Sequence, residues 1–331
     1  MTIIRLLICF CLGTIASLSL PPFGFLFFLP ISFTALLHVL LTSKSKRLSF
    51  YYGWFFGFGY FLFSLSWIGN ALMVEADKFA WMKPIALIGI PAFLGIYIGL
   101  VAFISSMVPN SKILSCWIFA ITWTLAEVIR SYFIFPFPWN ILGYSFYSSN
   151  ELSQFASILG VYGLSFIAVL FSSIFITRSL KAILISILFM GTIYLFGSTR
   201  LSKQYVDNTD VLSVRIVHSG QLAHHLGDQD KLIKQIKDLI KLSSQAYKSR
   251  PDVIIWPEAI VPLEPGGNIA KVLSDNLPKG SWLITGSDRI SYTIDKYKYY
   301  NSIISIDPNG EIGSIYDKHI LVPFGEYIPM R

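Results

Sequence analysis

Long apolar stretches with few polar interruptions dominate the first 198 residues of the chain. An α-helix needs roughly 20 mostly apolar residues to cross the hydrocarbon core of a bilayer. Stretches of this kind occur at residues 3–20, 23–42, 50–70, 84–108, 113–133, 156–177 and 181–198. The pattern therefore predicts a multi-pass α-helical membrane domain of about seven spans over residues 1–198.

The connection between the first two stretches is very short. It consists of Pro21-Pro22-Phe23-Gly24, a group of turn residues that suits a tight link between antiparallel spans. Alternatively, the first stretch is a secretory signal peptide, with Arg5 as its charged end and a short apolar core. The second stretch follows with almost no polar interval, and this favours the membrane-span interpretation.

From residue 199 onward the pattern changes to short apolar runs between polar segments. Runs typical of strands occur at 211–217, 252–256, 282–285, 299–306 and 311–316, and helical periodicity occurs at 230–247 and 269–277. Between the last two strands lies Asp307-Pro308-Asn309-Gly310, a strong turn signal that indicates a hairpin. This order of elements predicts an α/β layered domain over residues 199–331.

Charge divides the chain at the same place. Residues 1–198 hold ten Lys or Arg and four Asp or Glu, whereas residues 199–331 hold sixteen and fifteen. Since 54% of all residues are hydrophobic and 14% charged, disorder, a coiled coil and an ordinary cytosolic enzyme are poor fits. The net charge of +7 lies mostly between apolar stretches, so we expect it to orient membrane spans and expect no nucleic-acid partner.

The basic residues also indicate on which side of a membrane each connection lies. With a cytoplasmic N-terminus, the inner segments carry no acidic residue and the basic residues Arg5, Lys44, Lys46, Arg47, Lys112, Arg178 and Lys181. The outer connections mix both signs, with Lys78, Lys83, Arg130, Glu75, Asp77 and Glu151. The positive-inside rule then predicts a multi-pass protein of the bacterial inner membrane, with its N-terminus cytoplasmic and its α/β domain periplasmic.

Two features of the membrane region are candidates for more than a structural role. Glu127 and Arg130 stand three residues apart and share one helix face, either as an interfacial ion pair that orients the helix or as part of a site. The segment 135–144, which includes Trp139 and Tyr144, is rich in aromatic residues and Pro. It is either part of the aromatic belt at the headgroup level or a platform where a lipid chain enters a site.

The α/β domain offers three candidate catalytic residues. Glu258, in Trp256-Pro257-Glu258, follows a buried strand, where α/β folds tend to gather their chemistry. An apolar setting would raise the pKa of this carboxyl, as a general base needs, although such a Glu is also typical of a loop or a helix cap. Lys318 ends the hairpin, where a solvated surface lysine is the alternative. Glu326 stands among aromatic, Pro and Gly residues, where an unpartnered charge is costly to bury.

We expect neither a metal nor a cofactor. His224, His225 and Asp228 match no zinc-ligand spacing and lie in a polar stretch. Nor does the chain contain a Walker loop, a Rossmann fingerprint or a Gly-Xaa-Ser-Xaa-Gly elbow.

Taken together, these motifs resemble the bacterial apolipoprotein N-acyltransferases. The residues that show the resemblance are Pro21-Pro22-Phe23-Gly24, Trp123, Glu127, Arg130, Phe137-Pro138-Trp139, Leu142-Gly143-Tyr144, Trp256-Pro257-Glu258, Thr285-Gly286, Tyr300-Asn301-Ser302, Tyr316-Asp317-Lys318 and Leu321-Val322-Pro323-Phe324-Gly325-Glu326-Tyr327-Ile328-Pro329. They extend over nearly the whole chain. The resemblance implies a membrane domain fused to an extracytoplasmic domain of the nitrilase, or carbon–nitrogen hydrolase, fold, an α-β-β-α sandwich.

The resemblance also implies a reaction with a Glu–Lys–Cys triad. Glu258 would be the general base, Lys318 would stabilise the oxyanion, and Glu326 would help to orient the site. An acyl group would pass from a phospholipid to the Cys as a thioester, and then to the N-terminal amine of a diacylglyceryl-cysteine lipoprotein. Glu127, Arg130, Trp139 and Tyr144 would contribute to substrate binding.

The chain departs from the family pattern at the nucleophile. The family Cys lies downstream of the Lys, whereas Cys9, Cys11 and Cys116 all fall within apolar stretches. We therefore expect a C-terminally truncated product or a split-gene fragment, with an incomplete sandwich, that is inactive without a complementary C-terminal fragment. Two other hypotheses are a membrane-anchored amidase of the nitrilase superfamily and a lipid transporter or lipid-binding protein that is not an enzyme.

Overall fold

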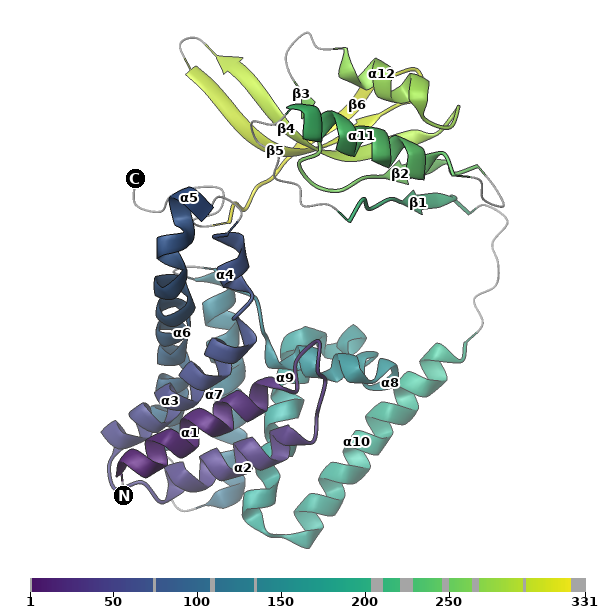
Figure 1. Ribbon diagram of the computed structural model, residues 1–331. Coiled ribbons are helices and arrows are strands. Elements are labelled where there is room, and N and C mark those ends of the chain that lie inside the picture. The colour runs from purple at the N-terminus through teal and green to yellow at the C-terminus, as the bar shows by residue number, and fades with distance from the viewer. Residues whose placement is uncertain are drawn as a thin grey trace. The chain divides into compact units, whose positions relative to one another are not determined.

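The computed structural model describes residues 2–73, 76–107, 111–133, 136–203, 211–220, 229–245, 250–263, 268–293 and 296–322. The chain divides into two compact units, Met1–Tyr205 and Val206–Arg331. The first unit is helical and the second contains the β-sheet (Figure 1).

Each of the seven apolar stretches contains a helix. These helices are α1 (Thr2–Ser17), α2 (Phe28–Leu41), α3 (Lys46–Ser64), α6 (Lys83–Ser105), α7 (Lys112–Tyr132), α9 (Ala156–Ser173) and α10 (Leu180–Leu201). Short elements connect them: α4 (Ile68–Ala71), α5 (Ala76–Phe79), η1 (Ala80–Met82), η2 (Leu142–Ser148), α8 (Asn150–Ser153) and η3 (Ile174–Thr177). The turn predicted at residues 21–24 lies between α1 and α2, where Gly24 has a φ of +70°.

Within the described part of the chain, four helical segments are long and apolar enough to cross a membrane. They are Ala80–Ser105, Lys112–Tyr132, Ala156–Thr177 and Leu180–Leu201. Thr2–Ser17 and Phe28–Leu41 are apolar but shorter. These lengths show a membrane-type helical region.

The helices of the first unit approach one another closely at small residues. A Cβ at Gly13 of α1 would lie 1.9 Å from the carbonyl oxygen of Phe56 in α3, and one at Gly59 would lie 2.2 Å from that of Phe10. Such contacts, which only glycine allows, are typical of helix pairs that associate in lipid. Away from the interior, large apolar residues remain exposed; Leu188, for example, is 72% exposed. An apolar outer surface of this kind suits a lipid environment.

The second unit is built on one mixed β-sheet. Its strands are β1 (Val214–Ile216), β2 (Val253–Ile255), β3 (Val261–Leu263), β4 (Trp282–Thr293), β5 (Lys296–Ile306) and β6 (Ile312–Asp317). The strand order is β1-β2-β4-β5-β6, with β3 also pairing with β4. Strands β1, β2, β3 and β4 pair in parallel, whereas β4, β5 and β6 pair antiparallel.

Two helices, α11 (Gln229–Ser243) and α12 (Ile269–Asn276), cover one face of this sheet (Figure 1). Leu239 of α11 and Leu273 of α12 are fully buried in the same core as Ile254, Leu283 and Ile304 of the central strands. This arrangement confirms the predicted α/β domain and the predicted hairpin, in which the amide of Gly310 donates to the carbonyl of Asp307 at 3.0 Å.

The opposite face of the sheet is apolar and exposed. The register places Val214 and Ile216 of β1, Trp282 of β4, Ile303 of β5 and Tyr316 of β6 on this face. Their exposed fractions are 50%, 79%, 42%, 52% and 63%. We refer to these five residues as the open sheet face.

Candidate active site

The backbone at the carboxyl end of β2 positions Glu258. The amide of Trp256 donates to the carbonyl of Ile284 at 2.9 Å, and the amide of Gly286 donates to that of Pro257 at 3.0 Å. The Trp256 indole donates to the Ser243 hydroxyl at 2.9 Å, which ties this segment to the end of α11. Glu258 therefore follows a strand end that hydrogen bonds fix to β4 and α11.

Gly286 allows the Glu258 backbone to lie directly against β4. A Cβ at this position would be 2.4 Å from the Cα of Glu258 and 2.5 Å from the amide nitrogen of Ala259. Contacts under 3 Å with backbone atoms force a shift, so only glycine fits here without displacing the candidate base. This gives a physical reason for the Thr285-Gly286 pair in the sequence.

Glu258 meets Lys318 although the two are sixty residues apart in the sequence. The Nζ of Lys318 lies 3.2 Å from Oε1 of Glu258, and the Nδ2 of Asn301 donates to the same oxygen at 2.5 Å. The amide of Lys318 also donates to the carbonyl of Asn301 at 2.8 Å. The hairpin β5–β6 thus brings an ammonium group and an amide to one carboxylate oxygen.

The surroundings of Glu258 differ from the apolar setting that the sequence predicts. Its side chain is 62% exposed, and that of Lys318 is 30% exposed. An ion pair and a hydrogen bond contact the Glu258 carboxylate, rather than apolar groups that would desolvate it.

A second charged pair holds the strand from which Lys318 emerges. Arg289 of β4 donates to both carboxylate oxygens of Asp317, at 3.2 and 2.7 Å, and the Ser302 hydroxyl donates to Asp317 at 2.7 Å. The Arg289 guanidinium also lies 4.3 Å from the ring centroid of Tyr300. Hydrogen bonds from Arg289 and then Ser302 lower the pKa of Asp317. This network fixes the residue immediately before Lys318.

In the helical unit, Glu127 and Arg130 are both buried near the end of α7. Oε1 of Glu127 accepts from the Trp123 indole at 3.1 Å and from the amide of Leu142 at 2.8 Å. The Nη2 of Arg130 lies 3.9 Å from the same oxygen. These contacts connect two turns of α7 to the start of η2.

Arg130 also holds the loop that precedes η2. Its guanidinium donates to the carbonyls of Phe137 and Trp139 at 2.7 Å each, and to that of Asn140 at 3.0 Å. The hydroxyl of Tyr60 donates to the Asn140 carbonyl as well, at 3.1 Å. Because Arg130 donates to three carbonyls of this loop and Glu127 accepts from the Leu142 amide after it, these contacts hold the loop in place.

Trp139 and Tyr144 lie on the loop and on η2, respectively. Their side chains are 40% and 45% exposed. The Trp139 ring lies 5.0 Å from the ring of Phe137 and 6.3 Å from that of Trp67, centroid to centroid. Arg130 therefore supports an aromatic cluster that remains accessible from outside.

The expected accessory carboxylate Glu326 lies outside the described part of the chain, and so do His224, His225 and Asp228, for which we expect no metal. Among the residues that the structure describes, no group of three or more His, Cys, Asp or Glu side chains is arranged to hold a metal ion.

Sequence reasoning did not assign roles to Asn301, Gly286 and Arg289. Asn301 and Arg289 are polar residues inside long strands, and each pairs with a site residue across the sheet. No signal in the sequence distinguishes Asn301, because β5 also contains Ser302, Ser305 and two lysines. Arg289 gave no signal either, because its part of β4 was not predicted as a strand.

The fold and the site together define the class of protein. A glutamate after a parallel strand pairs with a lysine after an antiparallel hairpin, in a chain that also contains a membrane-type helical unit. The sequence model described as "Carbon-nitrogen hydrolase" matches residues 216–331, and the one described as "Apolipoprotein N-acyltransferase N-terminal domain" matches residues 12–174.

Curated relatives agree with both matches. The chain is 35% identical to the apolipoprotein N-acyltransferase of Allorhizobium ampelinum, over 99% of this chain and 66% of the relative. It is 34% identical to that of Brucella melitensis, over 99% and 66%, and 33% identical to that of Rickettsia prowazekii, over 98% and 66%. The chain thus spans just under two thirds of the length of these relatives. It belongs to the apolipoprotein N-acyltransferase family.

Proposed function

We propose that this chain provides the membrane region and the Glu–Lys part of the active site of an apolipoprotein N-acyltransferase. The reaction moves an acyl group from a phospholipid to the N-terminal amine of a diacylglyceryl-cysteine lipoprotein. The contact of Lys318 with Glu258 at 3.2 Å is the observation that supports this proposal most strongly.

In the first half-reaction, Glu258 takes the proton from a cysteine thiol as the sulfur attacks the ester carbonyl of the phospholipid. Negative charge develops on the carbonyl oxygen, and the Lys318 ammonium stabilises it. The ester C–O bond then breaks, and Glu258 returns the proton to the leaving lysophospholipid oxygen. The product is a thioester on the sulfur.

In the second half-reaction, the α-amine of the lipoprotein attacks the thioester carbonyl. Glu258 accepts a proton from the attacking nitrogen, and Lys318 again stabilises the oxyanion. The C–S bond breaks, the amide forms, and the sulfur recovers a proton from Glu258. Glu326 is proposed to orient these groups as an accessory carboxylate. No cofactor or metal takes part in either half-reaction.

The thiol is proposed to come from outside residues 1–331, from a complementary C-terminal segment. Two observations support this part of the proposal. The described thiols Cys9, Cys11 and Cys116 are all in the helical unit, in α1 and α7. The open sheet face presents apolar side chains that a second layer of structure would bury, as in the α-β-β-α sandwich of the resemblance.

The helical unit is proposed to cross the inner membrane seven times, with the N-terminus in the cytoplasm and the catalytic domain in the periplasm. Support comes from the helix in each apolar stretch and from the basic connections on one side. The exposed rings of Trp139 and Tyr144, on a loop that Arg130 holds, are proposed to receive acyl chains of the substrates.

The test uses cells that lack their own acyltransferase. Residues 1–331 are produced together with the C-terminal third of the Brucella melitensis relative. The mass of the N-terminal peptide of a lipoprotein is then measured by mass spectrometry. We expect N-acylation with the pair, and loss of N-acylation with Glu258→Gln or Lys318→Ala. Lys271→Ala is the matched control, because Lys271 lies on α12 in an exposed ion pair with Asp275.

Three outcomes would contradict the proposal. Acyl transfer by purified residues 1–331 would remove the need for an external thiol. Full activity of both site variants would favour a protein that binds or transports lipid. Amide hydrolysis without transfer from phospholipid would favour a membrane-anchored amidase.

A further inference from the structure

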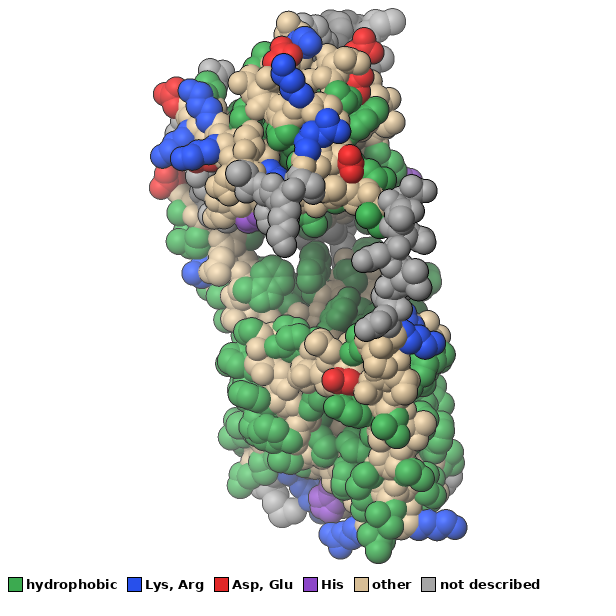
Figure 2. Space-filling view, turned by 90° about the vertical axis from the view of Figure 1, so that its right-hand side faces the viewer, with side chains coloured by type: hydrophobic (Ala, Val, Ile, Leu, Met, Phe, Trp, Pro, Cys, Tyr) green, Lys and Arg blue, Asp and Glu red, His purple; other side chains and the backbone are tan. Residues whose placement is uncertain are grey.

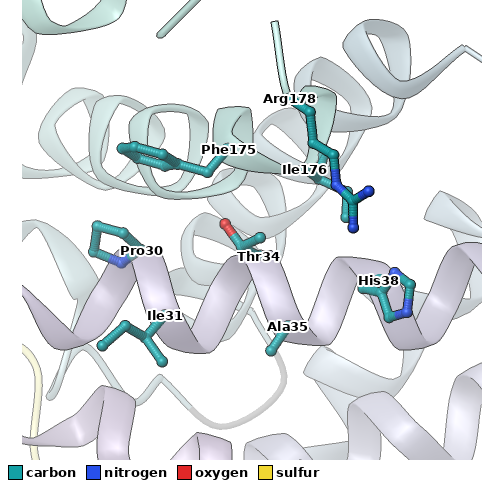
Figure 3. Close-up of a pocket in the computed structure, with 8 residues that line it drawn as sticks. All are labelled: Pro30, Ile31, Thr34, Ala35, His38, Phe175, Ile176 and Arg178. Carbon is teal, nitrogen blue, oxygen red and sulfur yellow. The ribbon is translucent and has the colours of Figure 1, made fainter. Parts of the chain in front are cut away.

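A groove runs along the outside of the helical unit, between α2 and the segment formed by α9 and η3 (Figure 3). Its volume is about 470 Å³. Pro30 and Ile31 of α2 and Phe175 of η3 line one part, and His38 and Arg178 lie at the other end. The groove is therefore apolar over much of its length and polar at one end.

Hydrogen bonds fix the walls of this groove. The Thr34 hydroxyl of α2 donates to the carbonyl of Ser172 in α9 at 2.8 Å, which joins the two helices at the floor of the groove. Arg178 follows η3 in the left-handed region, with a φ of 54°, and its amide donates to the Phe175 carbonyl at 3.2 Å. A non-glycine residue adopts this conformation at a cost. Here it turns the guanidinium back towards α2 (Figure 3).

The end of the helical unit that contains Arg178 is strongly basic. Arg5 donates to the carbonyl of Thr42 at 3.3 Å, so the start of α1 and the end of α2 lie together there. The described segments 2–5, 41–47, 111–112 and 174–181, at or next to helix ends, contain seven Lys or Arg and no Asp or Glu. Figure 2 shows blue basic side chains and a purple histidine gathered at the lower end of the helical unit.

We propose that this groove binds an anionic phospholipid. The Arg178 guanidinium and the His38 imidazole hold the headgroup phosphate, and an acyl chain lies along Pro30, Ile31 and Phe175. Arginine donates two hydrogen bonds to a phosphate at once, and basic pockets between membrane helices are typical headgroup sites. The apolar part of the groove favours a lipid over free phosphate, and the basic end favours an anionic lipid over a zwitterionic one.

This inference rests on the membrane placement of the helical unit and not on the acyl-transfer chemistry. Cys116, near the start of α7, contacts the carbonyl of Ser173, which directly precedes η3, whereas the Glu127 and Arg130 pair lies near the end of α7. A lipid here would be a bound component of the folded helical unit rather than an acyl donor. Its binding is measured without any assay of acylation, so the two proposals fail independently.

The test is native mass spectrometry of the full chain in a neutral detergent, with phosphatidylglycerol, phosphatidylcholine or inorganic phosphate added. We expect phosphatidylglycerol to bind at least fivefold more tightly than phosphatidylcholine, and phosphate alone not to bind. Arg178→Gln should weaken phosphatidylglycerol binding about tenfold, and Arg178→Lys should restore only part of it, because lysine keeps the charge but not the paired hydrogen bonds. Lys181→Gln is the matched control, since Lys181 belongs to the same basic end but does not line the groove.

A second variant tests the apolar part. Ala35→Phe places a ring in the groove and should reduce binding of both lipids, with the thermal unfolding midpoint recorded to show that the variant is folded. Equal affinity for the two lipids would overturn the proposal. Phosphate binding as tight as lipid binding would also overturn it. An equal loss of lipid binding in Arg178→Gln and Lys181→Gln would overturn it too, because the lipid would then respond only to the general positive charge of this end.

Discussion

At the scale of single residues, Gly286 decides whether Glu258 can occupy its place. Its missing side chain lets the backbone of the candidate base rest against β4, at a distance that no Cβ tolerates. The side chain of Glu258 itself is 62% exposed, and that of its partner Lys318 is 30% exposed. The precision of the site therefore depends on a residue that takes no part in the chemistry.

Gly286→Ala should destabilise the second unit by about 1–3 kcal/mol, because either β4 or the Glu258 segment must move to relieve the contact. Chemical unfolding followed by the fluorescence of Trp256 and Trp282 measures the loss. Gly313→Ala is the matched control. Its Cβ would lie 3.1 Å from the Ser305 hydroxyl and 3.2 Å from the Trp282 ring, and both side chains can shift. Equal effects of the two variants would contradict the role given to Gly286.

Asp317 should make the stability of the second unit depend on pH. Arg289 and Ser302 lower its pKa in the folded state, so its contribution is complete above the pKa of about 3.9 that an unfolded Asp has. The contribution is lost as the pH falls through the lower folded-state pKa. Wild type should therefore be more stable than Asp317→Asn at pH 7, and the difference should shrink as the pH falls below the unfolded-state pKa of about 3.9.

Thermal unfolding midpoints between pH 2.5 and 7 measure this difference. Asp275→Asn serves as the comparison, because Asp275 pairs with Lys271 at the surface with a side chain 59% exposed. Exposed pairs of this kind contribute little. A constant difference between wild type and Asp317→Asn across the whole range would refute the linkage.

At the scale of elements, α7 and the loop after it depend on one buried arginine. Arg130→Ala removes the donor to three carbonyls and leaves the Glu127 carboxylate buried without its cation. Breaking a buried pair from one side costs about 3–5 kcal/mol. The thermal midpoint in detergent should fall accordingly. Arg200→Ala, a change at an exposed arginine of α10, should leave the midpoint nearly unchanged.

How well each element could be predicted depended on whether its pattern was local. The apolar stretches and the strand at 253–255 follow from composition alone, since each is a continuous apolar run bounded by polar or turn residues. Strand β4 was predicted only to Thr285, because its continuation through Ser287, Asp288 and Arg289 is polar and gains its stability from pairing with β5. Strand β3 was missed because Pro262 lies in its centre.

The same limit applied to the site. The positions of Glu258 and Lys318 were identified from motifs, but nothing in their spacing indicates that they touch. Their contact depends on the register of β4 with β5 and of β5 with β6, which is a property of the folded sheet. The exposure of Glu258 was also not predictable, because the apolar residues next to it in sequence face away into the core, as Trp256 does at 4% exposed.

At the scale of the whole molecule, the proposed topology can be tested without activity. In a chain with Cys9, Cys11 and Cys116 changed to alanine, single cysteines are placed at Lys44 and Lys279. A membrane-impermeant maleimide added to intact spheroplasts should label Lys279→Cys and spare Lys44→Cys, which should react only after lysis. Labelling of Lys44→Cys alone from outside would show that the chain has the opposite orientation. Labelling of both from outside would exclude an odd number of crossings between the two positions.

The separation of sixty positions between Glu258 and Lys318 has a consequence for biosynthesis. Ribosomes add about 5–20 residues per second, so roughly 3–12 s pass between the synthesis of the two partners. During that interval the Glu258 loop is made, but the hairpin that supplies Lys318 and Asn301 is not. The Glu–Lys pair is therefore a late product of translation, and the membrane helices are complete before it exists.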